Sequence, residues 1–197
     1  MNSLEDPEPY HTFALWYQEH LKTSTSKHPA ACVLSTLGND GYPNARNLAL
    51  KELKYPYFVI TGSLDSRKEK EINNHSKIAL TFWWEASLHQ VRVQGTATTI
   101  DRKTAELLFS QRSRSAQLVS AVSNQGKTLD SIENLENDIR KYAEQLGESA
   151  VPCLENWGGY QILPIRVEFI EFRTDRLHQR TLYTFDNNKW TMSLLQP

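Results

Sequence analysis

The chain has 197 residues and a formal net charge of −1, with 39% hydrophobic and 23% charged residues. This composition is typical of one folded globular domain, or at most two small ones, and excludes collagen-like and largely disordered chains. Because 22 Lys and Arg are balanced by 23 Asp and Glu, the chain has no overall basic field, and we expect no nucleic-acid partner. It contains no apolar stretch of about 18 residues, so we expect no membrane span.

The two cysteines, Cys32 and Cys153, are far apart in the sequence, and neither belongs to a pair with metal-ligand spacing. We therefore expect no disulfide framework and no metal site, but two thiols in a reducing compartment. The acidic, proline-containing segment 1–10 has no apolar run and does not resemble a secretory signal. Together these features predict a cytoplasmic protein.

The first part of the chain predicts one helix followed by a meander of strands. Phe13, Trp16, Tyr17 and Leu21 recur at helical spacing, which predicts an amphipathic helix over about 10–23. Short β-rich runs separated by turn residues follow, interrupted by a short helix over 66–74 that Ser66 can cap. The expected strands are 31–36, 44–53, 57–61, 77–85 and 89–100.

A helical insertion is predicted over about 101–147. Asp101 can cap a helix that ends near Gln111, and more helix is expected after Ser115. Asp130 and Glu133 have the spacing of a capping box for the last helix of the insertion. Strands are then expected over 160–172, 180–185 and 189–194, the last two forming a hairpin around Asp186-Asn187-Asn188.

The helices interrupt one sheet instead of alternating with parallel strands. We therefore predict an α+β fold, in which an antiparallel barrel or half-open barrel carries flanking helices, and a single domain over 1–197. Dinucleotide and phosphate-loop fingerprints are absent, as are the common hydrolase and kinase motifs. The chemistry must then lie in cations placed on apolar strands and at the ends of elements.

The first cations of interest are Arg46 and Lys51. Arg46 shares one face of its strand with Leu48 and Leu50, whereas Lys51 falls on the other face. A bulge or the strand end could bring both cations to one pocket. The alternative is that each is a charge at the barrel rim, paired with an acid.

Two further segments combine polar and cationic groups. Arg67 and Lys68 lie beside a predicted helix start, where side-chain charge and free backbone donors suit a phosphate, although a solvated helix end has the same sequence. Gln90, Arg92 and Gln94 alternate along a strand and share one face, which could bind the edge of a heterocycle or be an exposed polar surface.

Two more cationic groups follow predicted element ends. The segment 111–115 holds Arg112 and Arg114 between serines, and could form a second anion pocket or stabilise the end of a helix. Arg176, His178 and Arg180 occupy alternate positions, so Arg176 and His178 could point to one side of an extended segment.

Taken in order, seven segments resemble the pyridoxamine 5′-phosphate oxidase family, the flavoproteins that make pyridoxal 5′-phosphate. Each motif is weak alone, but all seven occur in family order and with family-like spacing. The resemblance runs from about residue 10 to the end of the chain. The seven segments are 46–51, 60–61, 66–68, 82–85, 90–95, 157–160 and 176–178.

The resemblance implies a split-barrel homodimer with FMN in the subunit interface. It implies that Arg46, Arg67 and Lys68 hold the flavin phosphate, which agrees with the need of a dianion for several converging donors. The other FMN contacts that it implies are Asn47, Leu48, Ala49, Ile60, Thr61, Gln90, Gln125, Gly126, Ile170 and Arg180.

The resemblance also implies a substrate site and a reaction. Lys51 and Arg112 would clamp the substrate phosphate, and Arg176 and His178, the implied catalytic residues, would face its pyridine ring. The implied reaction oxidises pyridoxamine or pyridoxine 5′-phosphate to pyridoxal 5′-phosphate, with O2 as acceptor and H2O2 as product. Such hydride transfer requires the substrate carbon at about 3–3.5 Å from the flavin, not a covalent nucleophile.

The chain departs from the family pattern at four positions. Leu108 and Ala116 stand where the family usually supplies Tyr and Ser hydroxyls to the substrate phosphate, and Ile170 and Gly126 replace a Trp and a Ser near the flavin. The two lost hydrogen bonds, at about 1.5–3 kcal/mol each, would weaken phosphate binding more than a hundredfold unless the segment 113–115 substitutes.

Two alternatives therefore stay open. One is a related FMN-dependent oxidase that acts on another small aromatic substrate, such as a phenazine precursor. The other is a flavin or pyridoxal phosphate binding protein with little turnover.

Overall fold

The computed structural model describes residues 7–197. Part of the segment 1–10, in which we expect no secretory signal, thus lies outside the described residues. The chain divides into two compact units. The barrel unit comprises the described residues up to Ile60, together with Glu71–Thr98 and Gln161–Pro197, and the helical unit comprises Thr61–Lys70 and Thr99–Tyr160.

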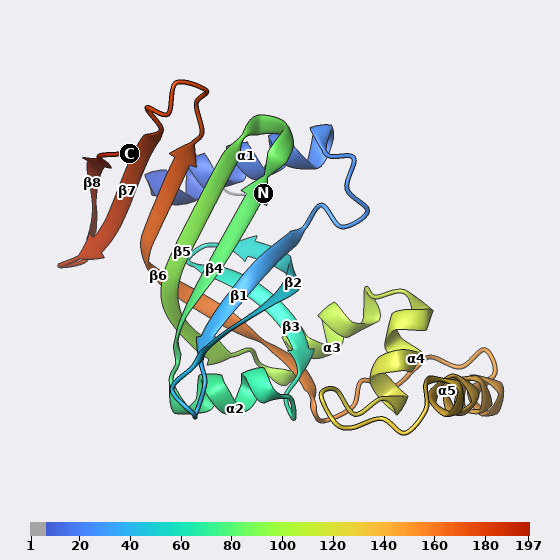
Figure 1. The fold of residues 1–197 in the computed structure, drawn as a ribbon. Helices are drawn as coiled ribbons and strands as arrows, with labels where there is room; N and C mark the ends of the chain where they lie inside the picture. The colour runs from blue at the N-terminus through green and yellow to red at the C-terminus, as the bar shows by residue number, and fades with distance from the viewer. Residues whose placement is uncertain (1–6) are drawn as a thin grey trace. The chain divides into compact units, whose positions relative to one another are not determined.

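In residues 7–197, eight strands form one antiparallel sheet in the order β3-β2-β1-β4-β5-β6-β7-β8, and β3 also pairs with β6. This extra pairing closes the first six strands into a barrel (Figure 1). The predicted split barrel with flanking helices is confirmed. The strands are β1 (Ala31–Leu37), β2 (Pro43–Lys54), β3 (Tyr57–Ser63), β4 (Lys77–Trp84), β5 (His89–Thr99), β6 (Trp157–Glu171), β7 (Gln179–Asp186) and β8 (Lys189–Leu195).

Strict alternation along β5 builds part of the barrel core. Val91 and Val93 are fully buried, whereas Gln90, Arg92 and Gln94 between them are not, as their spacing predicts. β4 ends one residue earlier than expected, because Glu85–Ser87 form a 3₁₀ turn that reverses the chain into β5.

Helix α1 (Glu8–Thr23) packs its aromatic face on the barrel. The ring of Phe13, fully buried, lies 4.9 Å from that of Phe58 and 5.0 Å from that of Phe82. Leu21 was expected on this face but is 43% exposed. The buried residue of the last turn is instead His20, whose Nε2 lies 2.9 Å from the carbonyl oxygen of Pro29.

Four more helices were expected and are present: α2 (Arg67–Asn74), α3 (Arg102–Ser110), α4 (Arg114–Val122) and α5 (Ile132–Leu146). Asp101 caps α3 as predicted, accepting a hydrogen bond from the Thr104 N–H at 2.9 Å. The predicted capping box at Asp130 is wrong. Ser131 caps α5 instead. It directly precedes the first residue of the helix, and its hydroxyl accepts a hydrogen bond from the Asn134 N–H.

The hairpin between β7 and β8 is confirmed. Asn187 and Asn188 form its turn and both have positive φ, 49° and 61°, a backbone conformation that Asn tolerates better than most residues. Within residues 7–197, no helix has the length and apolar character needed to cross a membrane.

Candidate functional site

The first turn of α2, in the helical unit, holds a buried lysine. Lys68 is 8% exposed. Its Nζ donates hydrogen bonds to the Ser63 carbonyl at 2.8 Å and to the Ser66 hydroxyl at 2.7 Å. The Ser66 hydroxyl in turn donates to the same carbonyl at 3.0 Å. These contacts hold an ammonium group at the start of α2, which is the kind of group that binds a phosphate.

Gly62 provides the space for this lysine. A Cβ atom at Gly62 would lie 2.8 Å from Nζ and 2.9 Å from Cε of Lys68, closer than atoms can approach without displacement. The sequence reasoning did not select Gly62. Its position directly after the β-rich run 57–61 could have indicated this role, because glycine in a strand often marks the close approach of another group.

A cavity of about 720 Å³ opens in the helical unit. Three of the residues singled out from the sequence line it, namely Thr61, Arg112 and Gln125. Gly126 follows Gln125 in a turn and has φ of +83°, a backbone conformation that glycine adopts without strain. The cavity also exposes polar groups of Lys70, Ser120, Asn124 and Lys127.

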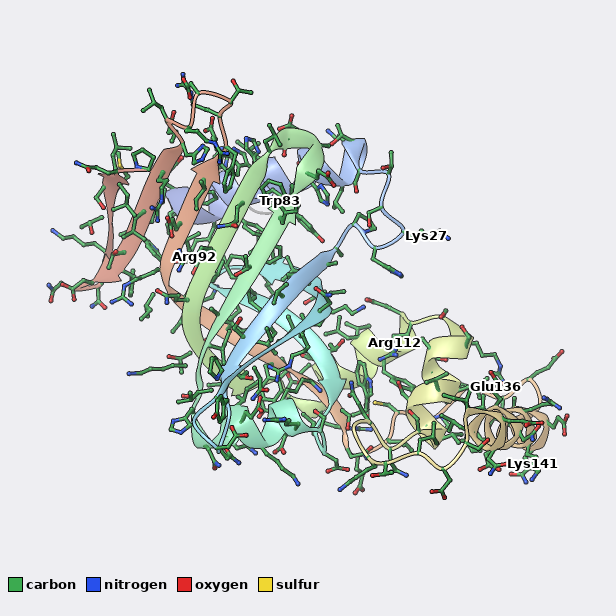
Figure 2. All side chains as sticks on the ribbon, viewed as in Figure 1. Lys27, Trp83, Arg92, Arg112, Glu136 and Lys141 are labelled. Carbon is green, nitrogen blue, oxygen red and sulfur yellow. The ribbon has the colours of Figure 1, made fainter. Side chains whose placement is uncertain are left out.

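Arg112 lies between α3 and α4 (Figure 2). Its Cζ is 5.2 Å from the ring centre of Trp157 and 5.9 Å from that of Phe109, and its Nη2 donates to the Ala116 carbonyl at 3.1 Å. Burial lowers the pKa of the guanidinium, which nevertheless stays charged at neutral pH. The two rings and the carbonyl thus fix a planar cation in the cavity wall.

The residues offered as substitutes for the missing clamp hydroxyls are engaged elsewhere. Arg114 donates to the carbonyls of Ser149 at 2.8 Å and Gly147 at 2.5 Å. Ser113 caps α4 and lies 3.1 Å from the Ser115 hydroxyl. Ser113 and Arg114 therefore support helix ends, and the Ser115 hydroxyl contacts the capping serine. Leu108 is 3% exposed in the packed side of α3.

In the barrel unit, Arg46 is paired with an acid. Its Nη2 donates to Oε2 of Glu71 at 2.8 Å, and its Nη1 contacts the Thr36 hydroxyl. The register of β2 with β3 shifts between Leu50 and Glu52, so an irregularity of the kind considered from the sequence falls at Lys51. The neighbours Asn47, Leu48 and Ala49 pair with β1.

A second ionic cluster centres on Glu168, which is 6% exposed on β6. Arg180 donates to its Oε1 from Nε at 2.8 Å and from Nη2 at 2.5 Å, and Arg92 donates to its Oε2 at 3.0 Å (Figure 2 labels Arg92). The sequence reasoning did not select this acid, although one carboxylate inside the apolar run 167–170 was a signal of a buried partner for a cation. Ile170 is opposite Arg180 in the register.

The expectation of an extended segment at Arg176 and His178 is wrong. A turn forms there, and Arg176 has φ of +67°. The ion pair of Arg173 with Asp175, at 2.7 Å, stabilises this turn. His178 Nδ1 accepts a hydrogen bond from the Arg173 N–H at 3.1 Å, so the tautomer with a proton on Nε2 is favoured.

The implied site residues are distributed over both units. Ile60 is 1% exposed, so its side chain belongs to the barrel core. The barrel unit carries Arg46, Asn47, Leu48, Ala49, Lys51, Ile60, Gln90, Ile170, Arg176, His178 and Arg180, and the helical unit carries Thr61, Arg67, Lys68, Arg112, Gln125 and Gly126.

Two family matches cover most of the chain. Residues 18–146 match the family described as pyridoxamine 5′-phosphate oxidase. The chain belongs to this family. Residues 157–197 match the region described as the pyridoxine 5′-phosphate oxidase C-terminal dimerisation region. The resemblance inferred from the seven segments and the prediction of an oxidoreductase are thereby confirmed.

Several relatives with similar sequences are named pyridoxine/pyridoxamine 5′-phosphate oxidases. The chain is 35% identical over 190 residues to a pyridoxine/pyridoxamine 5′-phosphate oxidase of Leptospira biflexa, covering 96% of this chain and 89% of that protein. It is 35% identical over 192 residues to one of Rubrobacter xylanophilus, covering 98% and 88%. For one of Coxiella burnetii the identity is 34% over 190 residues, covering 96% of each protein.

Two solved structures share the fold. PhzG from Burkholderia lata 383, in complex with tetrahydrophenazine-1-carboxylic acid, superposes with a TM-score of 0.90 at 24% identity, covering 98% of this chain and 95% of that one. A pyridoxamine 5′-phosphate oxidase-related, FMN binding protein from Nostoc punctiforme has a TM-score of 0.79 at 16% identity, covering 98% and 99%. At these identities the similarity establishes the fold alone.

Proposed function

We propose that the protein is an FMN-dependent oxidase that converts pyridoxamine or pyridoxine 5′-phosphate to pyridoxal 5′-phosphate. Oxygen takes up the two electrons and is released as H2O2; with pyridoxamine 5′-phosphate, water supplies the aldehyde oxygen and the amine leaves as ammonia. The strongest support for this function is the match to both family regions, together with the three cations to which the resemblance assigns the flavin phosphate, Arg46, Arg67 and Lys68. Because the matches span both units, we treat residues 1–197 as one functional domain.

The donor set suits FMN. Lys68 is held at the start of α2 by two oxygen atoms, and Gly62 leaves room for it. Arg46, Arg67 and Lys68 are then the groups that would hold the flavin phosphate, with Gln90, Gln125 and Arg180 as further contacts. FMN, when bound, supplies the acceptor for the hydride.

The chain's own residues bind and orient the substrate. Arg112, fixed against Trp157 in the cavity wall, would bind the phosphate together with Lys51. Arg176 and His178 would contact the pyridine ring. Hydride transfer depends on the position of the substrate carbon and does not require a covalent nucleophile. The main task of these four side chains is therefore to orient the substrate.

We also propose a homodimer in the cytoplasm. The match to a dimerisation region covers β6, β7 and β8. On β8 the side chains of Met192 and Leu194, at alternate positions, are 59% and 71% exposed, and they would contribute apolar area to a surface that a second subunit covers. Cys32 and Cys153 are free thiols, which is consistent with a reducing compartment.

One observation favours a second candidate function, oxidation of a different small aromatic substrate. Leu108 and Ala116 offer no hydroxyl, and the side chains of 113–115 are engaged at helix ends. Arg112 between two aromatic rings is suited to an aromatic carboxylate, which needs fewer donors than a phosphate. The PhzG structure, which shares this fold, holds such a carboxylic acid.

Steady-state assays with the FMN-loaded protein in air distinguish these functions. We expect pyridoxamine 5′-phosphate to yield pyridoxal 5′-phosphate and H2O2 in equal amounts. Pyridoxamine without its phosphate is the control, and its turnover should require far higher concentrations. If neither B6 compound is oxidised while tetrahydrophenazine-1-carboxylic acid is, the second candidate is correct. If FMN binds but no substrate of either class is oxidised, the protein is a flavin-binding protein with little turnover.

A further inference from the structure

Glu71 is a buried carboxylate at the centre of a polar cluster in the barrel unit. It is 1% exposed. Its Oε2 accepts hydrogen bonds from the Thr36 hydroxyl at 2.5 Å and from Arg46 Nη2 at 2.8 Å, and its Oε1 accepts from Asn44 Nδ2 at 2.8 Å. A buried charge persists only when it is paired and hydrogen-bonded. The three donors meet this requirement, and they fasten α2 to β1 and β2.

The same cluster fixes one edge of the Arg46 guanidinium. Nη1 donates hydrogen bonds to the Thr36 hydroxyl and to the Leu34 carbonyl, the latter at 3.5 Å. Nη2 uses one of its two N–H groups to donate a hydrogen bond to Glu71. Thr36 and Glu71 also bond to each other. The Nη1–Nη2 edge of the arginine is therefore held from two directions by a rigid acceptor pair.

The opposite edge of Arg46 remains available. Within residues 7–197, Nε of Arg46 has no hydrogen-bond partner, and the side chain is 26% exposed. Nε together with the second Nη2 proton forms the edge that binds two oxygens of one phosphate in parallel. An arginine held in this way loses little side-chain freedom when the anion binds.

We propose that Glu71 is a positioning residue, which orients Arg46 so that its Nε edge faces the flavin phosphate. This role presupposes the proposed FMN site. Two effects of Glu71 oppose each other. Its negative charge repels the phosphate through Arg46, whereas its hydrogen bonds keep Arg46 in one rotamer. We infer that orientation dominates, because Arg46 and Glu71 form a neutral pair and other cations of the site supply the net attraction.

Two substitutions of Glu71 separate the effects. Glu71→Gln removes the negative charge. Glu71→Asp keeps the charge, but its side chain is one methylene shorter, so the carboxylate lies farther from Arg46. If Glu71 positions Arg46, the dissociation constant of FMN rises about tenfold in both variants, the loss of about one charge-assisted hydrogen bond. If repulsion dominates, Glu71→Gln binds FMN more tightly and Glu71→Asp is unchanged.

Fluorescence titration of the apoprotein with FMN and with riboflavin provides the test. Riboflavin lacks the phosphate, so its affinity should stay within about twofold of the parent value in both variants. Glu106→Gln removes an exposed carboxylate that pairs with Arg102 and serves as the matched control, with no change for either ligand. Equal weakening of FMN and riboflavin overturns the inference, because general loosening of the fold acts on both ligands.

Arg46→Met distinguishes failure of the inference from failure of the proposed site. Weakened FMN binding in Arg46→Met, with both Glu71 variants at the parent value, overturns the positioning role alone. Unchanged FMN binding in Arg46→Met overturns the phosphate site and the role of Glu71 together. Should the Glu71 variants not fold, Thr36→Val removes the hydroxyl that joins Glu71 to Arg46, and it should weaken FMN but not riboflavin.

Discussion

Arg112→Met should weaken the binding of the anionic substrate without changing the binding of FMN. The substitution removes the guanidinium but keeps an unbranched apolar side chain against Trp157, whose ring centre lies 5.2 Å from Cζ of Arg112. Because the arginine is half-buried and its contacts with the two rings are near the upper distance limit for cation–π interaction, we expect a loss of only about 0.5–1 kcal/mol of folding stability. The protein should therefore remain folded.

The expected loss of substrate affinity is larger. A hydrogen bond to a charged group contributes about 1.5–3 kcal/mol, which corresponds to about 10- to 150-fold in affinity. Leu108 and Ala116 provide no hydroxyl, and Arg114 donates to two backbone carbonyls, so we expect none of these three residues to compensate. We expect an effect near the upper end, about a hundredfold.

Anaerobic rapid mixing measures this effect through the substrate dependence of flavin reduction. The apparent dissociation constant of pyridoxamine 5′-phosphate should rise about a hundredfold, while FMN affinity stays at the parent value. Arg140→Met, on the exposed face of α5, is the control and should leave both constants unchanged. Half-saturation of Arg112→Met at the parent concentration would refute the role of Arg112 as the substrate clamp.

Three further predictions concern cofactor binding and stability. In Gly62→Ala the new Cβ, 2.8 Å from Lys68 Nζ, should displace the lysine and weaken FMN binding about tenfold by titration; unchanged affinity contradicts this. Phe13→Ala should lower the free energy of unfolding in urea by about 3–5 kcal/mol, and a loss below about 1 kcal/mol would show that α1 does not complete the core. Burial raises the pKa of the Cys32 thiol from 9.0 to about 12, so this thiol ionises at lower pH in the unfolded chain than in the folded protein. The free energy of unfolding should therefore fall as the pH rises from 9.0 to about 12. Cys32→Ala should lose less unfolding free energy than the parent over this range, and equal losses would contradict the role of Cys32.

The fold was predictable because local patterns and turn chemistry agree along most of the chain. The alternation of Val91 and Val93 with polar residues, the Asp101 cap and the Asn187-Asn188 turn each determine their local structure with few long-range contacts. Errors occurred where neighbouring residues compete for one role. Asp130 and Ser131 are both good caps, and only the helix start at Ile132 selects the serine.

The site was less predictable, because its partners are brought together by the fold. Glu71 and Glu168 are remote in sequence from Arg46 and Arg92, at separations of 25 and 76 residues, and no local pattern connects them. The turn at Arg176 was missed because the spacing of Arg176 and His178 does not reveal the backbone conformation. The positive φ of Arg176 breaks the alternation that an extended segment would have. The cations themselves were recognisable from composition and order, whereas the acids that hold them were not.

Anaerobic addition of pyridoxamine 5′-phosphate to the FMN-loaded protein tests the proposed oxidase most directly. Without oxygen each protein molecule can react once, so the measurement does not depend on the acceptor. The account predicts complete loss of the oxidised-flavin absorbance band and formation of one pyridoxal 5′-phosphate per flavin. A band that persists at saturating pyridoxamine 5′-phosphate, in a protein that retains its FMN, would contradict it.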